Sequence, residues 1–139
     1  MDDRDDPIAD FFAQRRIAVV GATPNTARFG YRIFRYLRER GGHEVFGVHP
    51  SAEAIDGVPL HRSLADIPAP EGGGPPVDAV NLVVNPSIGI DVVRQAADLG
   101  VKRIWAQPGA ESREIAAFCR DRDLAYVEGC VLVEGPRQG

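Results

Sequence analysis

Residues 19–37, VVGATPNTARFGYRIFRYL, join an apolar segment to an amphipathic one through a turn that contains Gly21. The run RIAVVG at 16–21 is rich in β-branched residues and shows no alternation of polar and apolar side chains. Such a run is typical of a strand that is buried on both faces of a parallel sheet. From Gly30 the apolar side chains share one helical face, so we expect a helix that ends at the glycine pair 41–42. The stretch predicts a strand–turn–helix unit.

The rest of the chain continues the alternation of strands and helices. Asp6 before Pro7 predicts a short N-terminal helix over residues 7–14, because an aspartate cap and a proline in the first turn both favour helix initiation. Ser63 is expected to cap a short helical turn. Further strands are expected at 44–50, 58–61, 77–84, 103–107 and 125–129, and further helices at 87–100 and 112–121. We therefore predict an α/β fold, a doubly wound parallel sheet of about six strands with helices on both faces.

Length and composition indicate a single domain. The chain has 139 residues, of which 44% are hydrophobic and 26% are charged, as in one globular unit. The segment APEGGGPP at 69–76 is rich in glycine and proline. The strand–helix alternation resumes after it, so we expect a flexible surface loop at 71–76 within one domain, residues 1–139.

Charge and residue usage exclude several classes of function. The formal net charge of −4 provides no general attraction for nucleic acids or anionic membranes. The N-terminal sequence MDDRDDPIADFF is acidic where a secretory signal would be basic, and no apolar run reaches about 18 residues. The two cysteines and three histidines show no metal-ligand spacing. We therefore expect a cytoplasmic protein without a metal site, a nucleic-acid partner or a membrane anchor.

The fold itself predicts where a ligand would bind. In doubly wound sheets the site lies beyond the carboxyl ends of the strands, where the strand order reverses. For the order 3-2-1-4-5-6, the first and fourth strands would flank this crevice. Free amides at the start of the helix suit an anion, and Thr23, Asn25 and Arg28 add polar groups, although Thr23 and Asn25 could instead stabilise the turn. The segments expected to line the crevice are 21–30, 49–50, 85–87 and 107–109.

Motifs for the common nucleotide cofactors are absent. A dinucleotide-binding domain has G-x-G-x-x-G at this turn and an acidic residue at the end of the second strand. This chain has GATPNTARFG at 21–30, and its second strand ends in Val48, His49 and Pro50. The G-K-[ST] sequence of a nucleoside triphosphate loop is also missing. These observations disfavour ordinary NAD and ATP sites.

Six short motifs between Ile17 and Glu134 resemble one known family when they are taken together. They are VVGATPN, VHP, IDGVPLHRSLADIP, the NP after the fourth strand, IWAQPG and GCVLVE. The chain is similar to the small CoA-binding proteins, whose domain is similar to the CoA-binding domain of the succinyl-CoA synthetase α subunit. Phe29 and Gly30 replace a proline-serine pair that is commoner in this family, so the helix is expected to lack a side-chain cap.

The resemblance implies a Rossmann-like fold that binds CoA or an acyl-CoA. It places the pyrophosphate near residues 22–31 and the adenine end near His49, Pro50 and the loop at 84–88. The cofactor-binding residues predicted in this way are Gly21, Ala22, Thr23, Asn25, Arg28, Gly30, Tyr31, His49, Pro50, Val84, Asn85, Pro86, Ile88, Gln107, Gly109 and Cys130.

The sequence suggests no catalytic residues, because no nucleophile, base and orienting group can be brought together in the crevice. Surface or structural roles are expected for His43 and His61, and packing beside Pro50 or an adenine for His49. Cys130 follows the last strand, where it could form a mixed disulfide with CoA or pack as a small apolar residue.

Two residues with reactive or bulky side chains are expected in the core, namely Cys119 and Trp105.

The function that the motifs and the resemblance favour is a CoA or acyl-CoA binding module that holds or senses the cofactor. The alternatives are a nicotinamide-dependent oxidoreductase and a subunit of an acyl-CoA synthetase. A partner protein or a homo-oligomer fits the binding module.

Overall fold

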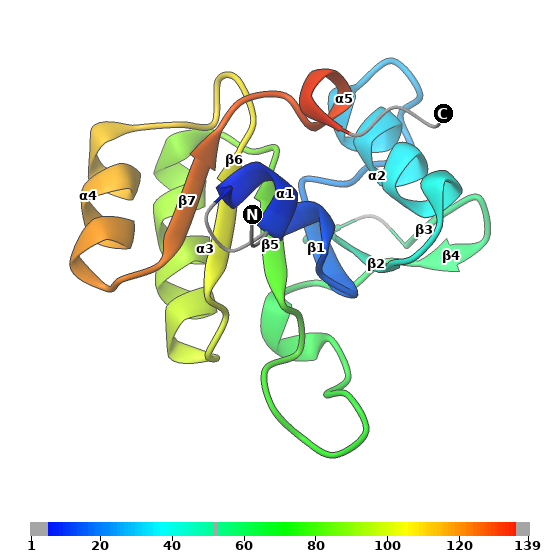
Figure 1. Cartoon of the computed structure of the whole chain (residues 1–139). Helices are drawn as coiled ribbons and strands as arrows, with labels where there is room; N and C mark the ends of the chain where they lie inside the picture. Colours follow the sequence, from blue (N-terminus) through cyan, green and yellow to red (C-terminus); the bar gives the residue numbers. More distant parts are fainter. Residues whose placement is uncertain (1–5, 52, 136–139) are drawn as a thin grey trace.

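The computed structural model describes residues 6–51 and 53–135 and has a five-stranded parallel sheet between two layers of helices (Figure 1). The strands lie in the order β2 (Glu44–Val48), β1 (Arg16–Val20), β5 (Ala79–Leu82), β6 (Arg103–Ala106) and β7 (Ala125–Glu128). All neighbouring strands of this sheet are parallel. β1 and β5 are adjacent, so the strand order reverses between them, and the doubly wound α/β fold is confirmed.

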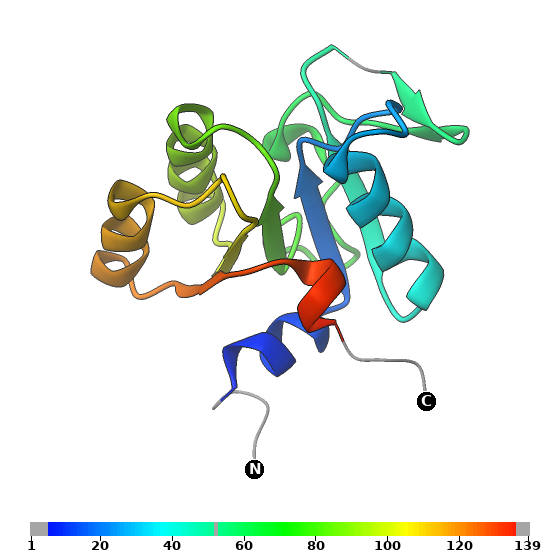
Figure 2. The same cartoon turned by 90° about the horizontal axis from the view of Figure 1, so that it is seen from above.

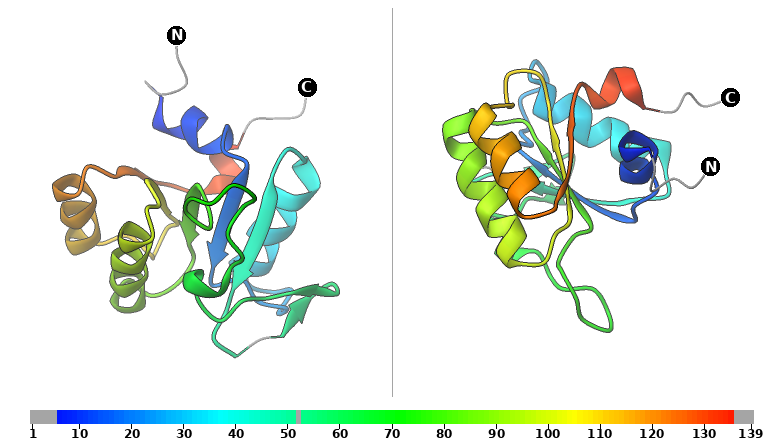
Figure 3. Two further views of the ribbon diagram at one scale, coloured as in Figure 1. Left: turned by 90° about the horizontal axis from the view of Figure 1, so that it is seen from below. Right: turned by 60° about the vertical axis from the view of Figure 1, so that its left-hand side comes forward.

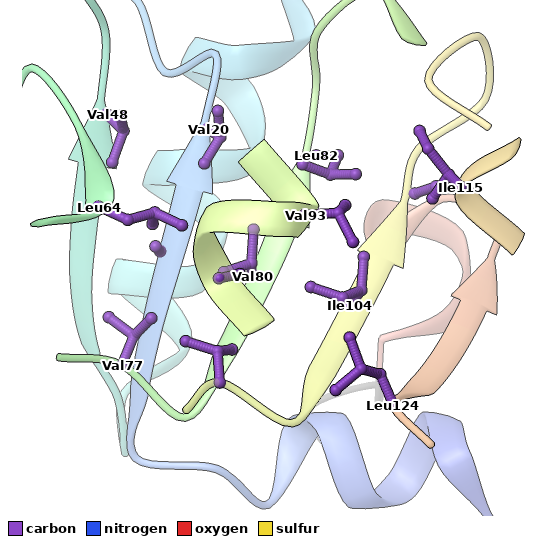
Figure 4. Packing of buried hydrophobic residues seen from close by; sticks show 14 of the residues in the cluster. Val20, Val48, Leu64, Val77, Val80, Leu82, Val93, Ile104, Ile115 and Leu124 are labelled. Carbon is purple, nitrogen blue, oxygen red and sulfur yellow. The ribbon is translucent and has the colours of Figure 1, made fainter. Parts of the chain in front are cut away.

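Helices cover both faces of the sheet (Figure 2). They are α1 (Pro7–Phe12), α2 (Phe29–Arg40), α3 (Pro86–Asp98), α4 (Arg113–Asp121), α5 (Val131–Glu134) and the 3-10 turn η2 (Leu64–Asp66). α1, α2 and α5 pack on the face that carries Val19 and Trp105. α3, α4 and η2 pack on the face that carries Val20 and Val80 (Figure 4). No helix in the described part of the chain has the length and apolar character needed to cross a membrane.

The N-terminal helix begins at the predicted position. One carboxylate oxygen of Asp6 accepts hydrogen bonds from the backbone N–H groups of Ile8 and Ala9, at 3.0 and 3.3 Å. The helix ends at Phe12, two residues short of the expected boundary. It is held on the sheet by an ion pair of 2.7 Å between Asp10 and the guanidinium of Arg103.

Aromatic packing explains why so short a helix is stable. The rings of Phe11 and Phe12 lie 4.9 and 5.6 Å from the ring of Trp105, measured between centroids. Trp105 is fully buried, as expected, and its indole N–H donates to the carbonyl of Gly129 at 2.7 Å. Tertiary contacts therefore stabilise α1.

The strand expected at 58–61 is not part of the main sheet. Its first residues belong to an antiparallel hairpin of β3 (Ala54–Ile55) and β4 (Val58–Pro59). The turn residues Asp56 and Gly57 have φ values of 49° and 81°, the left-handed pair that a tight two-residue hairpin requires. Of residues 58–61, His61 is the one that pairs with β2 through its backbone, in an isolated bridge to Val48. The sheet has five strands where about six were expected, and β2 lies at its edge.

The structure differs from the sequence-based expectations at the start of η2 and after β7. Ser63 makes no capping bond to η2, because its hydroxyl donates to the carboxylate of Asp66 at 3.2 Å. The short helix α5 was not expected from the sequence. It follows β7 directly, with Cys130 at its N-cap position and Val131 buried against the sheet.

The glycine-rich loop projects from the end of the molecule at which the strands begin (Figure 3). Residues 71–74 are exposed, and a Cβ added to Gly72, Gly73 or Gly74 would meet no atom within 4 Å. Pro76, at the end of the segment expected to be flexible, is buried, and its carbonyl accepts a hydrogen bond of 2.9 Å from Arg16.

We expect replacement of residues 71–74 by two glycines to leave the melting temperature nearly unchanged. The replaced residues bury little surface, and the entropy of loop closure changes slowly with loop length. Differential scanning calorimetry tests this expectation. A fall in Tm of more than about 8 °C would show that the loop packs on the core.

Candidate functional site

A cavity of about 720 Å³ lies over the carboxyl ends of β1, β2 and β5, which is where the switch-point rule places a ligand. Because α2 lies on one face of the sheet and η2 and α3 on the other, the walls of the cavity come from both layers of the fold. The lining residues are Val20, Gly21, Thr23, Asn25, Arg28, Phe29, Gly30, Val48, His49, Pro50, Arg62, Ser63, Leu64, Val83, Val84, Ile88, Val92 and Gln95.

Two glycines allow the turn between β1 and α2 to approach its neighbours closely. Gly21 has a φ of +105°, and a Cβ added there would lie 2.4 Å from the carbonyl oxygen of Val83. A Cβ added to Gly30 would lie 2.0 Å from the carbonyl oxygen of Gly21. The first turn of α2 therefore packs directly on the end of β1, and only glycine fits at both positions.

The start of α2 presents backbone donors to the cavity. Arg28 occupies the N-cap position and its side chain makes no capping bond, as expected for a helix that begins without serine or threonine. The amides of the first turn therefore have no side-chain acceptor, and the positive end of the helix dipole adds to them. Thr23 and Asn25 accept hydrogen bonds from Asn25 N–H and Ala27 N–H, at 3.2 and 3.0 Å. Both side chains thus stabilise the turn that carries these amides.

Two arginines give the cavity a positive character. Arg28 and Arg62 line it, and no aspartate or glutamate is among the lining residues. Neither guanidinium makes a hydrogen bond or an ion pair with any residue that the structure describes. Two unneutralised cations beside a helix N-terminus form a site suited to an anion, and planar guanidinium groups suit phosphate in particular.

The wall on the α3 side is apolar. Val83, Val84, Ile88 and Val92 form most of it, with Gln95 as its polar member, and Ile88 is 55% exposed at the cavity. On the α2 side Phe29 is also 55% exposed, with the guanidinium of Arg32 5.2 Å from its ring centroid. The cavity therefore combines a cationic region with an apolar one, as expected for a ligand that has a charged part and an apolar part.

Comparison with known families agrees with this geometry. The family described as the CoA binding domain matches residues 15–136, nearly the whole chain. The chain belongs to this family. The resemblance inferred from the sequence motifs is therefore confirmed.

Relatives of this CoA-binding domain include a longer ligase subunit and proteins of similar length to this chain. The α subunit of an ADP-forming acetate–CoA ligase II from Pyrococcus furiosus is 31% identical over 94 residues, which cover 68% of this chain and 19% of the subunit. A conserved hypothetical protein from Pyrococcus furiosus has a TM-score of 0.76 at 38% identity, covering 86% of this chain and 98% of its own. A hypothetical protein from Pyrococcus horikoshii has a TM-score of 0.82 at 29% identity, covering 96% and 89%. The chain thus spans about a fifth of the ligase subunit's length.

The cavity of the CoA-binding domain gathers many of the residues predicted from the sequence. They come from the first turn, from the end of β2 and from the start of α3. The predicted residues that line the cavity are Gly21, Thr23, Asn25, Arg28, Gly30, His49, Pro50, Val84 and Ile88.

Two predicted residues near the first turn do not line the cavity. Ala22 is fully buried in the core on the α2 face. The hydroxyl of Tyr31 donates to the carboxylate of Asp56 at 3.3 Å and accepts from Arg35 at 3.2 Å. Tyr31 therefore links α2 to the β3–β4 hairpin.

Asn85 and Pro86 also lie outside the cavity lining. Asn85 is the N-cap of α3, and its side-chain oxygen accepts from the backbone N–H and the hydroxyl of Ser87 at 2.9 and 2.8 Å. Pro86 occupies the first helical turn. The pair initiates α3, and Ile88 in the same first turn lines the cavity.

Gln107, Gly109 and Cys130 lie toward β6 and β7, outside the cavity lining. Gln107 is 3% exposed, and its side-chain oxygen accepts from the backbone N–H of Val131 at 2.9 Å and from the amide of Asn81 at 3.3 Å. Gly109 lies in a turn with a φ of +90°. Cys130 is half-buried and precedes α5. Of these three residues, Gln107 connects α5 to the sheet through its contacts with Val131 and Asn81.

Arg62 is the most informative lining residue that the sequence analysis did not select. It follows the hairpin and the bridge at His61, so its position depends on a chain reversal that the sequence analysis did not predict. Its neighbours Ser63 and Leu64 were read only as part of a helical turn. The motif VPLHRSL at 58–64 contained a signal for this position. Arg62 and Ser63 follow the expected edge strand, so they come at the same end of the sheet as the turn after the first strand.

The reactive side chains of His43 and Cys119, away from the cavity, are partly or fully buried in the fold. His43 lies before β2, and its ring contacts the carbonyl of Gln14 at 2.6 Å, while burial lowers the pKa of the imidazole. Burial also raises the pKa of the Cys119 thiol to about 11, so this thiol stays protonated at neutral pH. The described residues contain no group of three or more histidine, cysteine, aspartate or glutamate side chains that could hold a metal ion.

Proposed function

We propose that this chain binds CoA or an acyl-CoA in the cavity above β1, β2 and β5 and serves as a binding module. The observation that carries the proposal is the pair Arg28 and Arg62, which line one cavity with the α2 N-terminus and without an acidic residue. A ligand with several phosphate charges would neutralise both guanidinium groups.

The shape and lining of the cavity fit the parts of CoA. In doubly wound folds a pyrophosphate lies at the N-terminus of the helix that follows the first strand, here α2 with Arg28. The apolar wall of Val83, Val84 and Val92 would receive the pantetheine arm. A volume of about 720 Å³ lies within the range of cofactor pockets, roughly 300–1,000 Å³.

NAD fits this cavity less well than CoA. NAD-binding domains hold the ribose hydroxyls with a carboxylate at the end of the second strand. Here β2 ends at Val48 and is followed by His49 and Pro50, and no carboxylate lines the cavity. An oxidoreductase that uses NAD would lack this contact.

A second candidate is a role as one subunit of an ADP-forming acyl-CoA ligase, which the similarity to a ligase α subunit favours. The chain matches about a fifth of that subunit, so the remaining ligase chemistry would come from other domains or chains. Incubation of ATP, acetate and CoA with the missing ligase chains, with and without this chain, distinguishes the two roles. A separate binding module changes no ADP release, whereas ADP release and thioester formation that require this chain would favour the ligase role.

The binding proposal predicts a large effect for Arg28→Ala. The substitution removes a charge-assisted contact to phosphate, which corresponds to about 1.5–3 kcal/mol, or roughly ten- to a hundredfold in Kd. The exposed guanidinium makes no contact that the fold needs, so the melting temperature should hardly change. Titration calorimetry with CoA measures the effect.

The control is Arg120→Ala, which removes one positive charge from the far end of α4. It should leave the CoA affinity within about twofold, since exposed distant charges are screened by salt. Equal affinity of wild type and Arg28→Ala would remove Arg28 from the site. Stabilisation of the wild type by NAD and not by CoA would overturn the ligand assignment.

A further inference from the structure

We propose that Arg62 recognises a phosphate group on the ribose of the bound adenine nucleotide and so makes the cavity selective for ribose-phosphorylated cofactors. The inference rests on the proposed function for its ligand class and adds a residue and a selectivity to it. CoA carries such a phosphate at the ribose 3′ position, and dephospho-CoA lacks it.

The backbone that carries Arg62 is fixed to the end of β2. His61 forms a bridge with Val48, its N–H donates to the carbonyl of Gly47 at 2.9 Å, and its carbonyl accepts from His49 N–H at 2.8 Å. Arg62 follows directly and lines the cavity. The guanidinium is therefore carried by a segment that is paired with the last residues of the second strand in the chain.

The end of that strand is the ribose position in doubly wound nucleotide-binding folds. An acidic residue there accepts from the free ribose hydroxyls, whereas an arginine nearby accommodates a phosphate on the ribose. This chain has no carboxylate in the cavity lining and has Arg62 at the corresponding edge. The replacement of an acid by a cation favours the phosphorylated ribose.

Arg62 and Arg28 approach the ligand from different sides. Arg28 begins α2, whose helix packs on one face of the sheet, while Arg62 precedes η2, which packs on the other. Under the proposed function, Arg28 and the α2 amides would hold the pyrophosphate. Arg62 supplies a second cation, whose charge calls for a second anionic group.

The nearest carboxylate in the sequence does not neutralise Arg62. Asp66 accepts a hydrogen bond from the hydroxyl of Ser63 at 3.2 Å, and neither Asp66 nor any other acid lines the cavity. Arg62 is exposed and makes no ion pair with a described residue. Its guanidinium is thus available to a ligand phosphate.

The test is a calorimetric cycle with wild type and Arg62→Gln, each titrated with CoA and with dephospho-CoA. We expect Arg62→Gln to weaken CoA binding about ten- to a hundredfold and to change dephospho-CoA binding less than about threefold. Arg62→Lys keeps the charge without the planar fork and should give an intermediate loss. Arg120→Gln is the matched control and should leave both affinities unchanged.

The outcomes separate this inference from the binding proposal. Equal losses for CoA and dephospho-CoA, or no loss for either, would overturn the role of Arg62 while leaving CoA binding intact. If the wild type binds neither CoA compound, titrations with NADP and NAD decide. A preference for NADP that disappears in Arg62→Gln would keep the ribose-phosphate role and reject CoA, and the absence of any such preference would reject both.

Discussion

Gly30→Ala is expected to lower the free energy of unfolding by at least about 3 kcal/mol, because it places a methyl group against backbone. The added Cβ would lie 2.0 Å from the carbonyl oxygen of Gly21 and 3.3 Å from Cα of Ala22. No side-chain rotation relieves a contact with backbone, so the first turn of α2 would have to move away from β1. Urea denaturation followed by circular dichroism measures the loss.

Gly89→Ala is the matched control, because Gly89 also lies in the first turns of a helix that borders the cavity. A Cβ there would lie 3.3 Å from Cδ1 of Ile115, the far end of a flexible side chain. Alanine also has the higher helix propensity, so the net change should stay within about 1 kcal/mol. Similar losses for both variants would show that the approach of Gly30 to Gly21 does not limit the packing of α2.

The same contact explains why the absence of G-x-G-x-x-G did not exclude a nucleotide-type fold. In dinucleotide-binding domains the third glycine allows close packing of helix and strand. Gly30 has that role here, nine positions after Gly21 and at the end of a longer turn. The motif search failed on spacing, whereas the physical requirement for a side-chain-free contact is met.

The central strands could be predicted from the sequence because strands buried on both faces consist mainly of apolar residues. Ile17 and Val80 are both fully buried, and the run around Ile17 is uninterrupted, whereas the run around Val80 contains one polar residue, Asn81, which is itself buried. The helices were predictable for the complementary reason that one face is charged. Asp6 was predicted as a cap, and it accepts a backbone N–H bond at the start of α1, as Ser112 does at the start of α4.

The hairpin found where a strand was expected at 58–61, and the helix α5, both depend on tertiary contacts. A short sequence pattern does not show such contacts. The Asp56-Gly57 pair did carry a hairpin signal, but residues 58–61 were read alone as a strand. α5 has only four residues, too few to form a helix without tertiary contacts. Its position is set by buried Val131.

The location of the candidate site could be predicted from the sequence, but several of its individual lining residues could not. The strand order put the first turn, His49 and Val84 around one cavity. The polar residues that follow the remaining strands were expected there as well, but polar side chains at strand ends also satisfy backbone groups. Asn85 caps α3, and Gln107 bonds Val131. Which of the two roles a residue has depends on the helix that follows it.

Gln107→Leu should lower the free energy of unfolding by about 2–4 kcal/mol, because it leaves two buried donors without their acceptor. The Gln107 side-chain oxygen accepts from Val131 N–H and from the amide of Asn81, and the Asn81 side-chain oxygen already has no partner among the described residues. Leucine keeps the volume of the side chain and removes only its polarity. Urea denaturation gives the stability, and hydrogen exchange at the Val131 amide reports whether α5 opens first.

Gln95→Leu provides the contrast, because Gln95 lines the cavity and makes no hydrogen bond through its side chain with the described residues. Gln95→Leu should change the free energy of unfolding by less than about 0.5 kcal/mol. Gln107→Leu should accelerate hydrogen exchange at the Val131 amide. It should leave the affinity for CoA within about threefold. A large loss of CoA affinity in Gln107→Leu, with α5 still protected from exchange, would return Gln107 to the binding site. Otherwise the glutamine after β6 acts on the fold, through a buried oxygen that holds the C-terminal helix to the sheet.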